Sequence, residues 1–390
     1  MKPFAKKLGA GLTANVVLLG IVSFFTDMSS EIIFPLLPFF LVFNLGASFF
    51  IIGIMEGVAE AVASVLKVFS GYWSDKAGKR KPFISSGYGQ SAFTKLFFGL
   101  STIWQHGFFL RIVERVGKGL RQPPRDALIA ESSPPERKGK AFGFQKAMDT
   151  GGAIMGPLLA IILVSVFASA YQPIFLVATI PAFVGFTITL FLKEKKKEKV
   201  LKEPLKVGLK QLPIRMRVFV AIATIFALGN FSVFFVMLRT VDLGQTVTMA
   251  LVFYLIMNIT YAFSAIPAGS LSDRIGRVPT IVTGYLLFAV VCFIFAFQTG
   301  PILIGIAFLV LGLSNGFAIA VQRAYVCDLA PEEIRATCLG TYHMSIGFAK
   351  LFSGIMVGFL WTFVGVQFAF IYGVILSVMA ATMLYGLPRK

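Results

Sequence analysis

The sequence is poor in the residues that build disulfides, metal sites and nucleotide sites. Its 390 residues include two histidines and three cysteines, namely Cys292, Cys327 and Cys338. So few cysteines, all in the second half, exclude a disulfide framework, and no Cys/His cluster has the spacing of a zinc site. The nucleotide loop G-x-x-x-x-G-K-[ST] is absent, which argues against a built-in ATPase, and no nucleophile–base signature indicates an enzyme. Neither a metal site nor a cofactor is expected.

Charged residues are also scarce. They make up 14% of the chain, whereas 57% is hydrophobic and the mean hydropathy is +0.82. A soluble domain of this length could not cover so much apolar surface, and the alternating pattern of a membrane β-barrel is missing. Apolar runs of about 20 residues, enough to cross a bilayer core of roughly 30 Å, occur about twelve times. The predicted fold is an all-α membrane protein with twelve transmembrane helices.

The predicted spans form two sets of six. The first set is 12–42, 49–72, 83–102, 107–131, 139–166 and 172–192. The second set is 216–241, 247–270, 279–298, 301–328, 335–362 and 367–386. A lysine-rich stretch lies between them, so we expect an N-terminal bundle over 1–192, a basic cytoplasmic linker over 193–217 and a C-terminal bundle over 218–390.

The distribution of the net charge of +18 reflects membrane topology rather than nucleic-acid binding. If the N-terminus is cytoplasmic, the basic residues that lie outside the spans fall in the cytoplasmic (inner) gaps between spans, in the linker and at the termini. Examples are Lys2, Lys6, Lys7, Lys76, Lys81, Arg137, Lys138, Lys140, Arg274, Arg335, Arg389 and Lys390. The outer gaps, near 43–48, 103–106, 167–171, 242–246, 299–300 and 363–366, hold neither lysine nor arginine. This is the positive-inside rule, and it predicts that both termini are cytoplasmic and that no nucleic acid is bound.

A nine-residue pattern occurs twice, at the start of two ten-residue stretches. Gly71–Arg80 and Gly269–Val278 both read G-x-x-S-D-[KR]-x-G-[KR], and they begin 198 residues apart, at 71 and 269. Arg125 and Arg323 keep the same separation. Since six helices return the chain to the same side, the two halves are expected to form a parallel repeat about an axis along the membrane normal.

The repeated phrase resembles the signature loop of the major facilitator superfamily, and the resemblance covers the whole chain. It implies two pseudo-symmetric six-helix bundles, a central cavity and transport by alternating access. It also implies that the loops latch the bundles in the outward-facing state. The latch residues would be Gly71, Asp75, Gly78, Lys79, Arg80, Gly269, Asp273, Gly276 and Arg277. Gly78 is expected to adopt a positive φ in a tight turn. The plainer alternative to a latch is a basic topological turn.

The fourth span is unusually charged. At 100° per residue one of its faces carries Arg111, Arg115, Lys118, Gln122 and Arg125. Charges at membrane depth are costly, so this face is expected to meet a cavity or a partner. The pattern R-x-x-E-x-x-G-x-G from Arg111 resembles a motif of the superfamily's proton-coupled antiporters, which implies that Arg111 serves proton coupling.

Two further details concern the antiporter resemblance and the helical geometry of the fourth span. Arg115 stands where the antiporter motif usually has glycine, and Glu114 is placed to pair with Lys118 at i,i+4. Pro123 and Pro124 are expected to kink or break the inner end of the helix.

Acidic residues on two other spans are candidates to balance these cations. Asp27 and Glu31 lie one turn apart on the first span, and Glu56 and Glu60 lie one turn apart on the second. Buried carboxylates near arginine can hold or release a proton. Two interpretations stay open: a structural ion-pair network, or a proton-coupling network of Asp27, Glu31, Glu56, Glu60, Arg111 and Glu114.

The fourth span carries more cations than its likely acidic partners can balance. This surplus favours an anionic substrate such as an organic acid, a phosphorylated compound or an acidic siderophore. The candidate substrate-binding residues are polar positions expected to face the cavity. They are Arg115, Lys118, Arg125, Asn230, Asn258, Tyr261, Arg323, His343 and Lys350. His343 also has the simpler interpretation of a packing residue.

The fifth span contains Gly152-x-x-x-Gly156-Pro157, which resembles the motif of the superfamily's antiporters. Plain close packing of small residues is the alternative. Together these features predict a monomeric, proton-coupled secondary transporter in the bilayer of the cell membrane, exporting a small organic and possibly anionic solute. An organic-anion uptake symporter or facilitator and a divalent metal-ion carrier are the alternatives.

Overall fold

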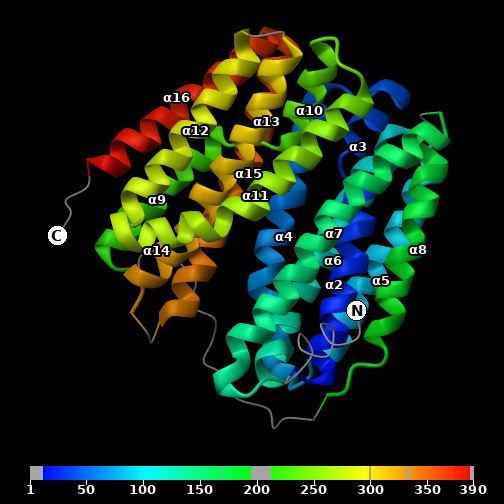
Figure 1. Cartoon of the computed structure of the whole chain (residues 1–390), viewed down its shortest axis with the longest axis vertical. Coiled ribbons are helices and arrows are strands. Elements are labelled where there is room, and N and C mark those ends of the chain that lie inside the picture. The colour runs from blue at the N-terminus through cyan, green and yellow to red at the C-terminus, as the bar shows by residue number, and fades with distance from the viewer. Residues whose placement is uncertain (1–11, 169, 195–211, 298–299, 332–333, 387–390) are drawn as a thin grey trace. The chain divides into compact units, whose positions relative to one another are not determined.

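The computed structural model describes residues 12–168, 170–194, 212–297, 300–331 and 334–386, and these residues form helices and short turns without a strand (Figure 1). Ten of their helical spans are long and apolar enough to cross a membrane. The two more polar helices α5 (Lys81–Phe98) and α6 (Trp104–Glu131) occupy the third and fourth places in the order. They complete the twelve spans that the sequence predicts.

Internal contacts divide the chain into unit 1, residues Met1–Leu36 and Val65–Glu203, and unit 2, residues Leu37–Ser64 and Pro204–Lys390. The helix α4 (Phe49–Ala77) therefore contributes its first half to unit 2 and its second half to unit 1. Most of the predicted linker, residues 195–211, lies outside the described residues. The predicted division into two bundles joined by this linker stays a prediction.

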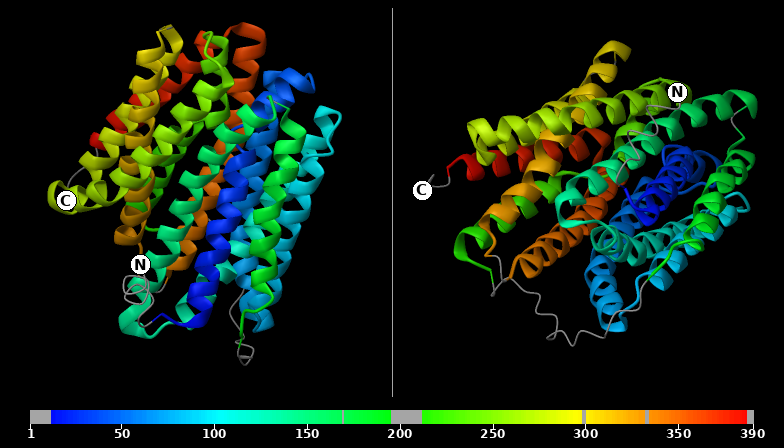
Figure 2. Two further views of the ribbon diagram at one scale, coloured as in Figure 1. Left: turned by 45° about the vertical axis from the view of Figure 1, so that its right-hand side comes forward. Right: turned by 60° about the horizontal axis from the view of Figure 1, so that its bottom comes forward.

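Unit 1 is built around α2. Besides α5, α6 and the second half of α4, it contains α2 (Ala14–Ile33), the short turn η2 (Pro135–Arg137), α7 (Lys138–Val166) and α8 (Tyr171–Thr189). The helix α2 packs along α7 and α8, and α5 packs along α6 and α8 (Figures 1 and 2).

Glycines bring α2 and α7 unusually close. A methyl group at Gly152 would lie 2.5 Å from the carbonyl oxygen of Phe24, and one at Gly156 would lie 2.7 Å from that of Met28. These distances are below van der Waals contact, so only glycine fits. The two glycines of the predicted fifth-span motif therefore set the separation between α2 and α7.

The helix α6 passes through Pro123 and Pro124 without a break, so the expectation that they break it is wrong. Proline at position 123 removes the N–H that would bond the carbonyl of Gly119 four residues earlier. That carbonyl instead accepts a hydrogen bond from the Ser70 hydroxyl of α4 at 2.8 Å. A neighbouring helix thus supplies the bond that the proline removes, as membrane helices require.

Unit 2 contains the remaining elements. They are α3 (Leu37–Phe39), η1 (Phe40–Asn44), α9 (Ile214–Gly229), α10 (Val233–Asp242), α11 (Val247–Ile275), α12 (Arg277–Phe297), α13 (Pro301–Asn315), η4 (Gly316–Ala320), α14 (Val321–Leu329), α15 (Arg335–Phe359), η6 (Leu360–Val364) and α16 (Val366–Tyr385). The first half of α4 packs on α15 through glycines: a methyl group at Gly57 would lie 2.8 Å from the carbonyl oxygen of Leu351. Gly354 and Gly358 make similarly close approaches to α4.

Two predicted spans are interrupted. The first has a turn after Ile33, where Pro35 disfavours a continuing helix. The seventh breaks between Gly229 and Val233. There Ser232 caps α10 by accepting a hydrogen bond from the backbone N–H of Phe234 at 3.3 Å, a role for which serine is favoured over continuing a helix.

Candidate functional site

The first signature loop folds around Arg80. Its guanidinium donates to the Ser74 hydroxyl at 2.7 Å, forms an ion pair with Asp75 and lies 3.2 Å from the Glu131 carboxylate at the end of α6. Burial alone would lower the pKa of Arg80, but the hydrogen bonds and charges of Asp75 and Glu131 raise it overall. Arg80 therefore stays charged. Gly78 has the predicted positive φ, +62°.

The second loop repeats this cluster. Arg277 donates to the Ser272 hydroxyl and to the Asp273 carboxylate, each at 2.6 Å, and to Asp328 of α14 at 2.8 Å. Gly276 has a φ of +99°. Glu131 and Asp328 were not identified from the sequence, because they lie about fifty residues after the loops that they bond.

The contacts correct the alignment of the repeat by one residue. The shared serine and aspartate keep the 198-residue separation, but by its partners Arg277 corresponds to Arg80 rather than to Lys79. The second loop is one residue shorter at this point. Lys79 is exposed, and Gly269 has open space around its Cα, whereas a methyl group at Gly71 would touch Pro123 at 3.4 Å.

The first half of α6 holds a buried ion pair. Arg111 and Glu114 are 5% and 6% exposed, and their charged atoms lie 3.2 Å apart. Arg115 approaches the same carboxylate to 3.9 Å, and the Phe34 ring of unit 1 lies 4.7 Å from the Arg111 guanidinium carbon. Lys118, the predicted partner of Glu114, acts on it electrostatically, as do the two arginines that form ion pairs with it.

Lys95 of α5 is 2% exposed, and the sequence offers no role for it. In the structure its ammonium donates to the carbonyl of Thr26 at 3.2 Å and to the Ser30 hydroxyl at 2.9 Å, both on α2. Asp27, Glu31 and Glu114 act on it electrostatically. Lys95 thus balances carboxylates from α2 and α6 at once.

The second half of α6 places Arg125 against α2 and α7. Its guanidinium donates to the Ser23 hydroxyl at 3.3 Å and lies 3.9 Å from the Asp149 carboxylate. Asp149 also accepts a hydrogen bond from Gln145, one turn earlier on α7, at 2.7 Å. Arg125 is ion-paired as well with its sequence neighbour Asp126 at 2.9 Å. Asp149 is an acidic residue of this site that the sequence reasoning missed.

Asp27 lies between these two parts. It is partly buried and acts electrostatically on Asp149, Lys118, Arg121 and Arg125. A methyl group at Gly152 would lie 3.1 Å from the Asp27 Cβ, so the close packing of α2 on α7 brings the Asp27 backbone to the helix that carries Asp149. No hydrogen bond reaches the Asp27 carboxylate from any residue that the structure describes.

Arg121 is a second buried arginine that was not predicted, because at 100° per residue it lies beyond the edge of the predicted cationic face of α6. It is 5% exposed, donates to the Gly87 carbonyl at 3.3 Å and lies over the Tyr88 ring at 4.7 Å.

We refer to the residues of unit 1 described above as the charge network. Its members are Asp27, Glu31, Lys95, Arg111, Glu114, Arg115, Lys118, Arg121, Arg125 and Asp149.

The predicted coupling residues Glu56 and Glu60 belong to unit 2. Glu56 is 7% exposed and accepts a hydrogen bond from Ser232, at the break between α9 and α10, at 3.1 Å. The structure therefore brings four of the six predicted coupling residues together in unit 1 and gives Glu56 a partner in unit 2.

The other candidates in unit 2 are spread over several helices. Asn230 lies in the break after α9, Asn258 and Tyr261 lie partly buried on α11, and Arg323 is exposed on α14. His343 and Lys350 are partly buried on α15, with the His343 ring 5.2 Å from that of Tyr342.

A buried hydrogen-bond chain in unit 2 was not predicted. Tyr342 donates to Gln322 at 2.5 Å, and Gln322 donates to Tyr285 at 2.9 Å. Within the described ranges, no group of three His, Cys, Asp or Glu side chains could hold a metal ion.

Comparisons with known proteins agree with this architecture. The sequence model of the Major Facilitator Superfamily matches residues 19–258 and 218–390. An uncharacterized MFS-type transporter of Methanocaldococcus jannaschii is 37% identical over 379 residues, 96% of this chain and 94% of that protein. The multi-drug resistance efflux pump PmrA of Streptococcus pneumoniae is 26% identical over 334 residues, 80% of each chain.

A solved structure gives the same result for the fold. The D-xylose-proton symporter is 14% identical to this chain and matches it with a TM-score of 0.76, over 96% of this chain and 97% of that one. The chain therefore belongs to the Major Facilitator Superfamily, and it is a multi-pass membrane transporter of small molecules and not an enzyme.

Proposed function

We propose that this transporter exports a small organic solute across the cell membrane in exchange for protons, by alternating access, with both termini in the cytoplasm. The observation that carries the proposal is Asp27, a partly buried carboxylate inside a bundle of cations that receives no hydrogen bond from a described residue. Exchange requires that proton and substrate exclude one another. A carboxylate that binds either a proton or a donor group of the substrate meets this requirement.

Two further observations support exchange. Gly152 and Gly156 bring α7 against the turn of α2 that carries Asp27, as the antiporter resemblance of the fifth span implies. A relative covering 80% of the chain is named a multi-drug resistance efflux pump.

The first test is a search for the solute. The purified full-length protein is heated with organic acids, phosphorylated compounds, siderophores and cationic drugs, because a ligand of the folded state raises the unfolding temperature. A hit is then taken to proteoliposomes with an imposed pH gradient. Accumulation that follows the gradient supports proton coupling, and accumulation that ignores it refutes coupling.

A second candidate function is symport of an organic anion with a proton, and the cationic surplus of α6 favours it. Protonation of Asp27 would leave Arg125, Lys118 and Arg121 with less negative charge to balance. An anion would then bind more tightly together with the proton than without it. This electrostatic effect couples an anion and a proton in the same direction, so the direction of proton flow distinguishes the two candidates.

Arg115→Gln tests whether the substrate is an anion. Arg115 lies 3.9 Å from the Glu114 carboxylate, beside Arg111, which pairs with the same carboxylate at 3.2 Å. Loss of a charged hydrogen bond to the substrate is expected to weaken its apparent affinity about tenfold. The measurement is the concentration dependence of uptake, with Arg137→Gln, an exposed arginine of η2, as the control. Equal affinity in wild type and Arg115→Gln would remove Arg115 from the binding site.

We also propose that the two signature loops latch the transporter in the outward-facing state. Asp75→Asn keeps the shape of the side chain but removes its ion pair with Arg80. For an ion pair worth about 1 kcal/mol, the conformational equilibrium is expected to shift roughly fivefold. The readout is the rate at which a cysteine placed at Tyr261, in a background without native cysteines, reacts with a soluble maleimide.

Asp242→Asn is the matched control for the latch, because Asp242 also pairs with an arginine, Arg239, but lies outside both signature loops. The latch proposal expects a changed labelling rate in Asp75→Asn alone. Unchanged labelling in Asp75→Asn would leave the loop as a basic topological turn.

A further inference from the structure

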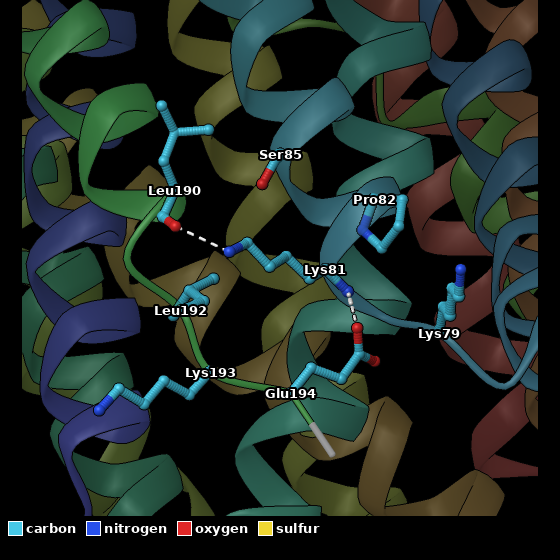
Figure 3. A pocket seen from close by; sticks show the side chains of 8 residues that line it. All are labelled: Lys79, Lys81, Pro82, Ser85, Leu190, Leu192, Lys193 and Glu194. Atoms are coloured by element: carbon cyan, nitrogen blue, oxygen red, sulfur yellow. Dashed lines mark hydrogen bonds between the residues drawn. The ribbon is translucent and has the colours of Figure 1, made fainter. Parts of the chain in front are cut away.

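A pocket opens where the start of α5 meets the segment that follows α8, apart from the charge network (Figure 3). Its volume is about 650 Å³, which is in the range of small-ligand sites. It is lined by Lys79, Lys81, Pro82, Ser85, Leu190, Leu192, Lys193 and Glu194, all of unit 1. Three lysines against one glutamate make the lining cationic.

Two interactions hold the walls of this pocket together. The Glu194 carboxylate accepts hydrogen bonds from the backbone N–H groups of Arg80 and Lys81, the second at 3.0 Å. These donors at the start of a helix have no partner within the helix. The Lys81 ammonium donates to the Leu190 carbonyl at 2.7 Å. The segment after α8 is therefore fixed to α5, and the pocket between them is part of the fold (Figure 3).

The lining keeps polar groups that the described residues do not fully use. The Ser85 hydroxyl oxygen is buried and has no hydrogen-bond partner among the residues that the structure describes. The Lys81 ammonium has three N–H donors and gives one to Leu190. Lys79 and Lys193 are exposed at the rim. A hydroxyl and an ammonium with spare donors, surrounded by further positive charge, suit a phosphate group.

We propose that this pocket binds the phosphate of an anionic phospholipid headgroup. The Ser85 hydroxyl and the Lys81 ammonium donate to the phosphate oxygens, and the rim lysines supply the surrounding charge. A lipid is favoured over a soluble phosphate because apolar surface continues from the pocket: Leu190 is 52% exposed and Phe191 is 67% exposed. Neither the transported solute nor the coupling ion enters this proposal.

The test is native mass spectrometry of the full-length protein in detergent, titrated with phosphatidylglycerol or with phosphatidylcholine. We expect one phosphatidylglycerol to bind in preference to phosphatidylcholine. Ser85→Ala should weaken that binding about tenfold, and Lys79→Gln with Lys193→Gln should weaken it about fivefold for each lysine removed. The removed lysines are exposed and the added alanine is smaller than serine, so the variants should fold; the unfolding temperature in lipid-free detergent checks this.

The control pair is Lys76→Gln with Lys138→Gln, which removes the same charge outside the pocket. Equal weakening by the control pair would show diffuse attraction and overturn the site. A third arm adds millimolar inorganic phosphate. Retention of phosphatidylglycerol supports the lipid, whereas its displacement, with phosphate binding lost in Ser85→Ala, would assign the pocket to a soluble phosphate and overturn the lipid assignment.

Discussion

Asp27→Asn is expected to abolish transport driven by a pH gradient while exchange of labelled for unlabelled solute continues. Asparagine keeps the shape of aspartate and can still bond a donor group of the solute, but it cannot take up a proton. Accumulation against a gradient should fall to the level of empty vesicles, whereas counterflow, which needs no net proton movement, should persist. Proteoliposomes with equal amounts of reconstituted protein allow both to be measured.

Asp126→Asn is the matched control for this prediction. Asp126 is ion-paired with Arg125, but its side chain is 41% exposed, so it should contribute much less to coupling. The network account expects pH-driven transport to survive in Asp126→Asn. Transport by Asp27→Asn that still follows the gradient would exclude Asp27 from the mechanism.

Gly152→Ala is expected to destabilise the protein strongly. In the fraction that still folds, it is expected to uncouple solute transport from proton movement. The added methyl group would lie 2.5 Å from the Phe24 carbonyl oxygen and 2.9 Å from the Met28 backbone nitrogen, neither of which can move without shifting α2. Overpacking of this kind costs about 1–3 kcal/mol or more. It would also separate Asp27 from Asp149. The measurements are the thermal unfolding temperature in detergent and pH-driven uptake.

Gly143→Ala, on the same helix α7, provides the comparison. No atom lies within 4 Å of a methyl group at Gly143. Alanine in place of glycine inside a helix stabilises by roughly 0.5–1 kcal/mol when space allows. The two variants should therefore change stability in opposite directions. If Gly152→Ala were as stable as Gly143→Ala, the close contact of α2 and α7 would not constrain the site.

The signature repeat and the twelve spans were predictable because hydrophobic length and a short motif are local properties of the sequence. The positive φ of Gly78 followed for the same reason. The one-residue shift that pairs Arg277 with Arg80 could not be predicted from the sequence, because it depends on the contacts of Arg277 with Ser272 and Asp328, which are made in three dimensions.

The charge network was predictable only in part. Arg111, Glu114 and Arg125 stood out because charges on an apolar helix are rare. A single Asp149 on the fifth span has no local pattern, and its role depends on the contact with Arg125 and on the closeness of α2. The position of Lys95 inside an apolar span could not be explained from the sequence. It is explained by the hydrogen bonds that its ammonium donates to the carbonyl of Thr26 and the hydroxyl of Ser30.

In proton exchange the solute leaves as protons enter, so the direction of proton flow during solute efflux decides between exchange, symport and uncoupled transport. Vesicles containing the transporter and a trapped pH-sensitive dye are loaded with the solute and diluted into solute-free buffer, without an imposed pH gradient. We expect the vesicle lumen to acidify as the solute leaves. Alkalinisation would show that proton and solute travel together, and an unchanged lumen during solute efflux would show that they are not coupled; either result would contradict the account.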